Sequence, residues 1–550
     1  MRRRVLFSSL MVGFAALAVL FAGAALPQRV SAQQATTISI STGSLQVGDL
    51  LQQGRQLELQ RRWGEALAHY EDAMRLFPGE SLLQRRFELA RSHYDLERRY
   101  ADRSYLNALV ELPPAKALDL YGDVLLKIQV HYVEVPSWQE LVDRGTDNLD
   151  VALSERSFVE RNLPQQSQAA VDAFRRELHD TLAQRVVRSR SETREAAATA
   201  AQLAQQRLQI PPTAVVLEYM CGATNTLDAY SAYLTPNQLN EVYSQIEGNF
   251  VGLGIELKAI DGKLSIVRVI PGSPAEQAGI RPGDRIASVD GQSTADLSTD
   301  EAANLLQGEA GTVVELTVAH PPLALRRVSV CRRRVDVPSI DHVRILDANQ
   351  GVAYLHLACF QKTTSRDLEE ALWKLHHDGM KCLIIDLRGN PGGLLVTAVE
   401  VVDKFVGAGV IVSTRGRSLQ EDFTYSAHSS GTWRVPLVVL IDQDSASAAE
   451  ILAGAIRDHR RGTIVGVRSF GKGSVQGIFP LDFSSAGVRL TTARFYSPSG
   501  RPYSRVGVEP HLQVHHAARP IDGVVAPTSD GEDPMLTAAL EAARELRQRR

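Results

Sequence analysis

Cysteine is scarce in this chain, and neither sign of charge dominates it. The four cysteines among 550 residues lack CxxC spacing, which gives no support to a zinc ribbon or a thioredoxin-like redox site; they are Cys221, Cys331, Cys359 and Cys382. Because Cys359 and Cys382 have mostly apolar neighbours, we expect buried free thiols there, although pairing in an oxidising compartment stays open. The formal net charge is only −3, so nucleic acid is not the expected main partner.

Metal-binding motifs and internal apolar runs are also missing. The sequence has no HExxH motif and no Asp-rich calcium loop, so neither a metal nor another cofactor is expected. Beyond residue 32 no 18 consecutive apolar residues occur, so no second membrane span is expected. A hydrophobic content of 44% fits a folded globular chain rather than a disordered one, and 550 residues are enough for two to four domains.

The N-terminal 32 residues have the pattern of an export segment. Three arginines at positions 2–4 precede an almost wholly apolar run over residues 5–26, and small residues follow at 30–32. This order is typical of a secretory signal peptide. The run is also long enough to span a bilayer, so an uncleaved membrane anchor remains the alternative. Either one places the rest of the chain outside the cytoplasm, in a periplasmic, cell-envelope or membrane-anchored location.

Helical patterns dominate the first half of the remaining chain. Residues 40–112 carry the small, aromatic and proline positions of a tetratricopeptide repeat, with a plain helical hairpin as the alternative; these positions are Gly54, Ala66, Tyr70, Ala73 and Pro78. Residues 113–246 are also expected to be helical. Within them, residues 154–207 have few large apolar side chains, which predicts an exposed helical arm or an insertion.

Two further domains are indicated by a change of pattern near residue 247. Residues 247–335 alternate β-branched segments with Gly and Pro turns, which predicts a compact β-rich domain. Residues 336–515 alternate short apolar strands with helices, which predicts a mainly parallel sheet. The tail over residues 516–550 is expected to be loose and to close with a short helix. The fold class is therefore multidomain, with a helical, a β-rich and an α/β part.

Three loops of the α/β part carry candidate chemistry. An apolar strand runs into the sequence DQDSASAAE and then a helix, which places Ser447 at a helix N-terminus where free N–H groups stabilise an oxyanion. Lys472 lies between two glycines, and burial beside a helix N-terminus would depress its pKa enough for a general base. Gln476 is expected one helical turn on, near the amine. Gly393 ends an NPGG turn that can aim an N–H at a substrate. Taken singly, an ordinary N-cap, a solvated loop lysine and a connecting turn are the alternatives.

Together these motifs resemble the carboxyl-terminal processing peptidases, or tail-specific proteases. The resemblance rests on DLRGNPGG, DSASAAEILAGAIRDH, SFGKGSVQ and GVEPHL, while GLGIEL with SPAEQAGIRPGDRIASVDG resembles a PDZ domain. It implies a Ser–Lys serine endopeptidase with a crotonase-like α/β fold, in which the PDZ domain recognises the free apolar C-terminus of a protein substrate. The residues it implies are Ser447 as nucleophile, Lys472 as base, Gln476 as its amide partner, Gly393 and Ala448 as oxyanion donors, and Leu253, Gly254 and Ile255 as the PDZ loop.

The sequence also departs from the family pattern. Asp444 stands where the family usually has glycine, and LDAYSAYL replaces the usual LDPHSSYL. The N-terminal helices lie outside the common pattern, and a protein partner or a second copy of the chain is open for them. An inactive scaffold that binds protein C-termini is the alternative function, and acyl-coenzyme A chemistry on the same fold is a more remote one. An inactive copy would be expected to have lost Ser447, Lys472 or Gln476.

Overall fold

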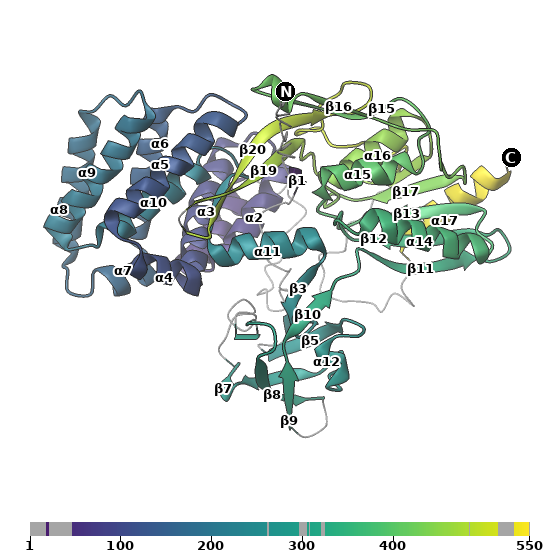
Figure 1. Cartoon of the computed structure of the whole chain (residues 1–550), viewed down its shortest axis with the longest axis horizontal. Helices are drawn as coiled ribbons and strands as arrows, with labels where there is room; N and C mark the ends of the chain where they lie inside the picture. Colours follow the sequence, from purple (N-terminus) through teal and green to yellow (C-terminus); the bar gives the residue numbers. More distant parts are fainter. Residues whose placement is uncertain are drawn as a thin grey trace, which may run out of the picture.

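The computed structural model describes residues 18–20, 47–260, 263–295, 305–306, 308–320, 325–482, 484–514 and 533–548. The expected export segment therefore lies outside the described residues except for a three-residue strand, β1 (Ala18–Leu20). Within the described part of the chain, no helix combines the length and the apolar character that a membrane span requires. The chain forms a helical region, a β-rich domain and an α/β domain (Figure 1).

The helical region begins with a hairpin of two antiparallel helices, followed by one long helix. Gly54 lies against the ring of Tyr70, so close that a Cβ at position 54 would be 2.2 Å from a ring carbon. The small residue at position 54 thus lets α1 and α2 pack closely. The helices of this region are α1 (Val47–Leu59), α2 (Trp63–Leu76), α3 (Ser81–Ala101), α4 (Arg103–Glu111), α5 (Pro114–His131), α6 (Trp138–Ala152), α7 (Arg156–Asn162), α8 (Gln168–Ala183), α9 (Arg190–Leu208), α10 (Pro212–Asn225) and α11 (Pro236–Glu247).

The prediction of an exposed arm over residues 154–207 is wrong. Helix α9 buries a stripe of small residues in the same core as α5, α6 and α10; the stripe consists of Ala196, Ala197, Ala200, Ala201 and Ala204. Alanine lets helix backbones approach closely, so a face without large side chains can still be a packing face. The scarcity of large apolar residues therefore did not signal exposure.

The β-rich domain is an antiparallel sheet in the order β4-β5-β6-β8-β9, and it projects away from the other two parts (Figure 1). A two-stranded ribbon, β3 with β10, leads into and out of it. Its elements are β3 (Asn249–Gly252), β4 (Ile255–Ile260), β5 (Lys263–Val269), α12 (Pro274–Gln277), β6 (Arg285–Val289), β7 (Gln292–Ser293), β8 (Val313–Ala319), β9 (Arg326–Cys331) and β10 (Arg333–Asp336).

The α/β domain contains the expected parallel sheet, in the order β11-β12-β13-β17-β18-β21 with only β11 antiparallel. Helices α14, α15 and α16 cover one face, and the C-terminal α17 packs on the other. The elements are β11 (Ile340–Asp347), β12 (Val352–Leu357), α14 (Thr364–His377), β13 (Cys382–Asp386), α15 (Leu395–Asp403), β17 (Leu437–Ile441), α16 (Ala448–Asp458), β18 (Thr463–Gly466), β21 (Leu512–Gln513) and α17 (Pro534–Gln548).

A second, antiparallel sheet was not foreseen and joins the helical region to the α/β domain. Its order is β14-β1-β19-β20-β15-β16, and β2 pairs with β20. The helical region adds a further bond, from the Val133 N–H to the Thr491 carbonyl (2.8 Å). The strands are β2 (Ala232–Leu234), β14 (Gly393–Leu394), β15 (Val410–Gly416), β16 (Phe423–Ser426), β19 (Ser474–Pro480) and β20 (Gly487–Tyr496). This sheet fixes the segment that follows Lys472.

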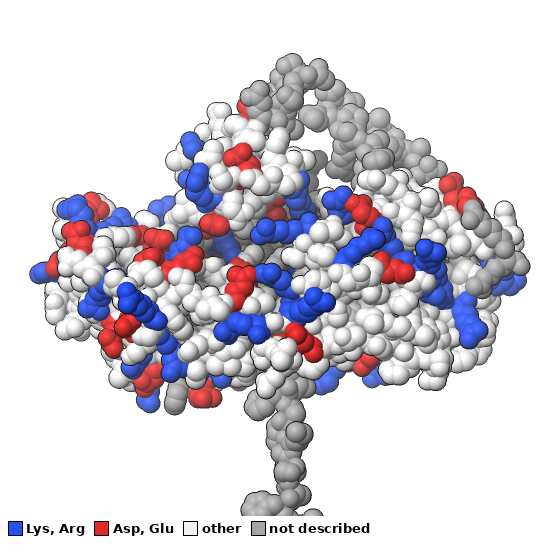
Figure 2. Space-filling model, turned by 90° about the horizontal axis from the view of Figure 1, so that it is seen from above, with Lys and Arg blue, Asp and Glu red and all other residues white. Residues whose placement is uncertain are grey.

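Charged side chains of both signs are interspersed on the face of the molecule seen in Figure 2. This mixture agrees with a net charge near zero. Of the cysteines, Cys382 and Cys221 are buried, Cys359 is half-buried and Cys331 is exposed, and none of these four forms a disulfide. Cys359 and Cys382 are thus thiols without a disulfide, as expected, and only Cys382 is fully buried.

Candidate active site

Ser447 occupies a strained turn between β17 and α16. Its φ is +62° and its ψ −113°, a backbone conformation that non-glycine residues rarely adopt and that costs about 1–3 kcal/mol. The side chain is fully buried, and its Oγ has no hydrogen-bond partner within the described residues. An ordinary N-cap has extended backbone angles and a bonded side-chain oxygen. Ser447 therefore holds the cap position of α16 without the conformation of a usual cap.

The neighbouring serine, Ser445, has a structural role in the turn. The Ser445 hydroxyl donates to the Leu387 carbonyl (2.8 Å) and accepts from the Asp442 N–H (2.9 Å). One residue on, the Ala446 N–H donates to the Asn390 carbonyl (2.9 Å). The turn that holds Ser447 is thereby fastened to the turn that precedes Gly393.

Gly393 lies on β14 where no other residue fits. Its φ is +143°, and a Cβ there would be 2.1 Å from the Phe360 carbonyl oxygen. The Leu394 N–H donates to that same carbonyl (2.8 Å), which holds the strand in place. Ala448 is the first residue of α16, so its N–H lies at the helix N-terminus, where the dipole favours negative charge.

Lys472 is almost completely buried, with 1% of its surface exposed. Burial lowers the pKa of its ammonium group well below the usual value, and the Arg489 guanidinium lowers it further, while the carboxylates of Glu450 and Asp228 act in the opposite direction. The ring of Tyr230 lies over the amine, 4.6 Å from Nζ to the ring centroid. The alternative of a solvated loop lysine is wrong, because the side chain is buried.

Gln476 lies on β19 and not one helical turn after Lys472, so that prediction is wrong. The segment pairs with β20 along its whole length, which imposes extended backbone. The fully buried Gln476 amide donates from Nε2 to Ser474 Oγ (2.9 Å) and to Thr491 Oγ1 (3.3 Å). Its Oε1 is buried, and the described residues supply no hydrogen-bond partner for it. The acceptor oxygen is therefore available to a donor in the site.

Glu450 joins the serine loop to the lysine loop. Its carboxylate is fully buried on the first turn of α16, where Oε2 accepts from the N–H groups of Ser447 (2.7 Å) and Lys472 (2.8 Å). Oε1 accepts from the Gly471 N–H (2.7 Å) and the Ser469 hydroxyl (2.6 Å). Burial raises the pKa of the Glu450 carboxyl, and these hydrogen bonds lower it. One carboxylate thus sets the relative position of both loops.

Known proteins match both functional parts of the chain. Residues 351–514, which include Gly393, Ser447, Lys472 and Gln476, match peptidase family S41, and residues 265–320 match the PDZ domain. The chain is 37% identical over 302 residues to the carboxy-terminal-processing protease of Bartonella bacilliformis, covering 53% of this chain and 68% of that protein. The chain belongs to peptidase family S41.

Further relatives of this S41 peptidase carry the same description. The carboxyl-terminal-processing protease of a Synechocystis species is 35% identical over 322 residues, covering 58% of this chain and 74% of that protein. Among solved structures, a photosystem II D1 C-terminal processing protease aligns with a TM-score of 0.39 and 26% identity, covering 72% of this chain and 93% of that one. The family matches and the two curated relatives show that the protein is a serine peptidase of the C-terminal processing type with a PDZ domain.

Sequence reasoning missed Glu450 and Tyr230 as members of the S41 site. A signal for Glu450 was present, because a serine followed three residues later by glutamate is the pattern of a capping box. The signal for Tyr230 lay in LDAYSAYL, where tyrosine replaces the histidine of the family pattern. Neither pattern indicates which residue the side chain contacts. Tyr230 and Lys472, for example, lie 242 positions apart in the chain and come into contact only in the folded protein.

The expected PDZ loop opens β4. Leu253 is buried, and its carbonyl accepts from the Ala275 N–H (2.9 Å). Gly254 has a φ of +81°, and a Cβ there would be 2.2 Å from Ser273 Cβ, which explains glycine at this place. In the described part of this sheet β4 is the edge strand, so one side of Ile255 and its successors is open to a further strand.

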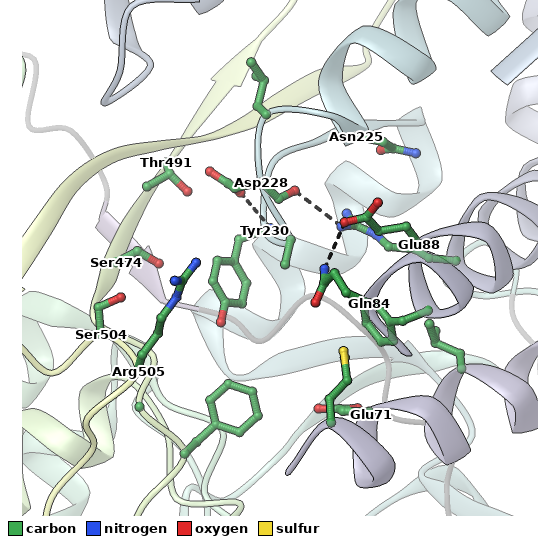
Figure 3. A pocket seen from close by; sticks show the side chains of 18 of the residues that line it. Glu71, Gln84, Glu88, Asn225, Asp228, Tyr230, Ser474, Thr491, Ser504 and Arg505 are labelled. Atoms are coloured by element: carbon green, nitrogen blue, oxygen red, sulfur yellow. Dashed lines mark hydrogen bonds between the residues drawn. The ribbon is translucent and has the colours of Figure 1, made fainter. Parts of the chain in front are cut away.

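A cavity of about 1320 Å³ lies beside the loops that carry Ser447 and Lys472 (Figure 3). On one side it is lined by Ser469, Phe470, Gly471 and Ser474 from the S41 domain, and Tyr230 points into it. Helices α2 and α3 form the opposite side, with Glu71, Gln84 and Glu88. The cavity is large enough for several residues of a substrate chain.

Replacing Glu450 with glutamine should damage both stability and turnover. Either orientation of the amide sets an NH₂ group against two N–H or O–H donors, which costs about 2–4 kcal/mol of unfolding free energy. The loops that carry Ser447 and Lys472 then shift, and a misplacement of about 1 Å lowers kcat by roughly 10²-fold. Thermal unfolding and peptide turnover measure the two effects. Glu400→Gln, an exposed change in the same domain, is the control; an unchanged melting temperature and kcat for Glu450→Gln would contradict this role.

Proposed function

We propose that this S41 peptidase is an endopeptidase that acts outside the cytoplasm and cleaves protein chains near their C-termini. Ser447 is the nucleophile and Lys472 the general base. The observation that carries the proposal is the pair of buried groups: a serine held in a strained turn with an unbonded Oγ, and a lysine whose pKa burial lowers, on loops joined by the Glu450 carboxylate. A hydroxyl without a partner and a neutral amine that can take its proton are what nucleophilic attack requires.

In the reaction, Ser447 Oγ attacks the scissile carbonyl carbon while Nζ of neutral Lys472 takes the hydroxyl proton. The N–H groups of Gly393 and Ala448 stabilise the tetrahedral oxyanion, each contributing on the order of 3 kcal/mol. The C–N bond then breaks, and Lys472 returns the proton to the leaving amine. Water attacks the ester in the same way and frees Ser447. The open acceptor of Gln476, Oε1, suits the Lys472 amine, and we assign it to orient that amine.

The substrate is proposed to lie extended between two strands. In the structure β1 pairs antiparallel with β14 at Gly393 and with β19 at Gln476, so a strand-wide place separates the oxyanion loop from the strand that carries the amide. A peptide in this place gains main-chain hydrogen bonds on both sides. Folded segments cannot enter a place one strand wide, so the substrate class is unfolded tails.

The PDZ domain supplies the preference for C-termini. The loop of Leu253, Gly254 and Ile255 leads into the open edge of β4, an arrangement that captures a terminal carboxylate and pairs with the residues before it.

The N-terminal 32 residues support the extracytoplasmic location, as a signal peptide or a membrane anchor. The hairpin α1–α2 supports a tetratricopeptide-like fold for the first helices. The two sheets of the S41 domain support a crotonase-like fold for that domain.

Amidation of the substrate tail should reduce cleavage. An unstructured protein with a short apolar tail is incubated with the full chain, with its C-terminus free or amidated, and the fragments are read by mass spectrometry. Hydrogen bonds to a charged group contribute about 1.5–3 kcal/mol, so kcat/KM should fall about tenfold or more on amidation. A tail ending in aspartate controls for the loss of apolar contact.

Equal cleavage of both tails would contradict C-terminal recognition. Binding of the free tail without fragments from pH 6 to 10 would contradict the peptidase and leave the inactive scaffold.

A further inference from the structure

The wall of the cavity opposite the S41 domain comes from a part of the chain that the S41 match does not include. Helices α2 and α3 lie before residue 112, whereas the match covers residues 351–514. The side chains that these helices contribute to the cavity are both apolar and charged: Leu67, Glu71, Met74, Arg75, Phe87 and Glu88. The helical region therefore forms one wall of the cavity beside the loops that carry Ser447 and Lys472.

Arg75, at the end of α2, contacts both catalytic loops. Its Nη1 lies 3.4 Å from Asp444 Oδ1, three residues before Ser447. Its guanidinium also lies over the ring of Phe470, 5.5 Å from the ring centroid and two residues before Lys472. The side chains of Arg75 and Asp444 are 27% and 31% exposed, so the pair is only partly screened by water.

The two loops also meet each other at this point. The Phe470 N–H donates to the Ser445 carbonyl (3.0 Å), so Arg75 sits over a direct hydrogen bond between the serine loop and the lysine loop. On its own helix the guanidinium is held by Glu71 (3.1 Å) and Asp72 (3.7 Å). These carboxylates restrict Arg75 to the side of α2 that faces the loops.

This contact accounts for the departure of Asp444 from the family pattern. A glycine at this position would offer no partner to a cation on α2. The Asp444 carboxylate instead lies on the outside of the turn, where it accepts a hydrogen bond from Arg75. The backbone N–H of Asp444 donates to Asp442 Oδ1 (3.1 Å). Asp444 in the turn and Arg75 on α2 therefore form one contact between the serine loop and the helical region.

We propose that the hairpin α2–α3 is a working part of the active site, and that Arg75 is a positioning residue that holds the serine and lysine loops together. This inference rests on the proposed function for its effect on catalysis, and on geometry alone for its effect on the loops.

The test is a double-mutant cycle of Arg75→Ala, Asp444→Ala and the double variant in the full chain. Each single change should lower kcat about five- to tenfold with KM within about twofold, because an interaction with the loops and not with the substrate is lost. The double variant should be no slower than either single variant. Arg75→Lys, which keeps the charge, should recover part of kcat. Arg103→Ala removes an exposed cation on α4 that does not line the cavity, and its kcat and KM should be unchanged.

Hydrogen exchange provides a readout that needs no turnover. Arg75→Ala should speed exchange of amides in 442–447 and 468–473 about three- to tenfold, with other segments unchanged. Unchanged exchange and kcat, or single effects that multiply in the double variant, would overturn the inference. A wild type that cuts nothing but shows the exchange effect would sink the proposed function and leave Arg75 as the link between the loops.

Discussion

Replacement of Ser447 by alanine is expected to abolish cleavage, with kcat falling roughly 10⁶-fold, as is typical for loss of a catalytic serine. The reason is that Oγ is the atom that bonds to the substrate, and no second hydroxyl can take its place. The Ser445 hydroxyl is hydrogen-bonded to the Leu387 carbonyl and the Asp442 N–H, and the Ser469 hydroxyl donates to Glu450. Binding of an apolar C-terminal tail should persist, because the PDZ domain is a separate domain. Fragment analysis and tail binding measure the two properties.

Stability is the internal control for this variant. Alanine also prefers to avoid a φ of +62°, so the backbone strain at position 447 remains and the unfolding free energy should change by less than about 1 kcal/mol. Ser445→Ala is the matched variant. It breaks the bond to the Leu387 carbonyl and should destabilise the turn while retaining measurable turnover. Residual cleavage by Ser447→Ala within about 100-fold of wild type would show that another nucleophile acts.

Replacement of Lys472 by methionine is expected to lower kcat by roughly 10³- to 10⁴-fold, the contribution of a positioned general base. Methionine has a similar volume and no proton-accepting nitrogen, so it fills the same buried space between Tyr230 and β19. Lys472→Arg should be equally inactive, because arginine remains protonated. Turnover of either variant near the wild-type rate would exclude Lys472 as the base.

The pH dependence follows from the same amine. Lys472 accepts a proton only when neutral, so kcat/KM should rise with pH through the pKa of Lys472 and then level off. Because burial lowers the pKa of Lys472 well below its usual value, the rise should be complete at a lower pH than for an unshifted lysine. Arg489→Met removes the second cause of the low pKa and should move the rise to higher pH. A bell-shaped pH profile of kcat/KM with its maximum below pH 6 would contradict a lysine base.

The sequence was informative where local pattern determines structure. The apolar strand before Ser447 and the helix after it became β17 and α16, and strand–helix alternation gave the parallel sheet. The motif-bearing loops were found as well, because glycine, proline and serine mark turns by their own backbone preferences. Each of these features depends on residues within about ten positions of one another.

The errors arose where distant segments decide the outcome. The four-residue spacing of Lys472 and Gln476 suits a helix, but pairing with β20 imposed a strand. The small alanine side chains of α9 predict no core, but they pack closely against α5, α6 and α10. The Glu450 bonds reach 22 positions along the chain and the Arg75–Asp444 pair 369, distances at which sequence patterns carry no information on contact. The site is thus built from predictable loops in an arrangement that only the folded chain supplies.

The most direct test of the central claim is to trap the ester on the enzyme. The full chain is mixed with a peptide p-nitrophenyl ester, quenched in acid within milliseconds and digested, and the adduct is located by mass spectrometry. The account predicts one acyl group on Ser447 in the wild type and none in Ser447→Ala. Lys472→Met should form the adduct far more slowly. Release of p-nitrophenol with no adduct, or an adduct on another residue that turns over at the rate of kcat, would contradict it.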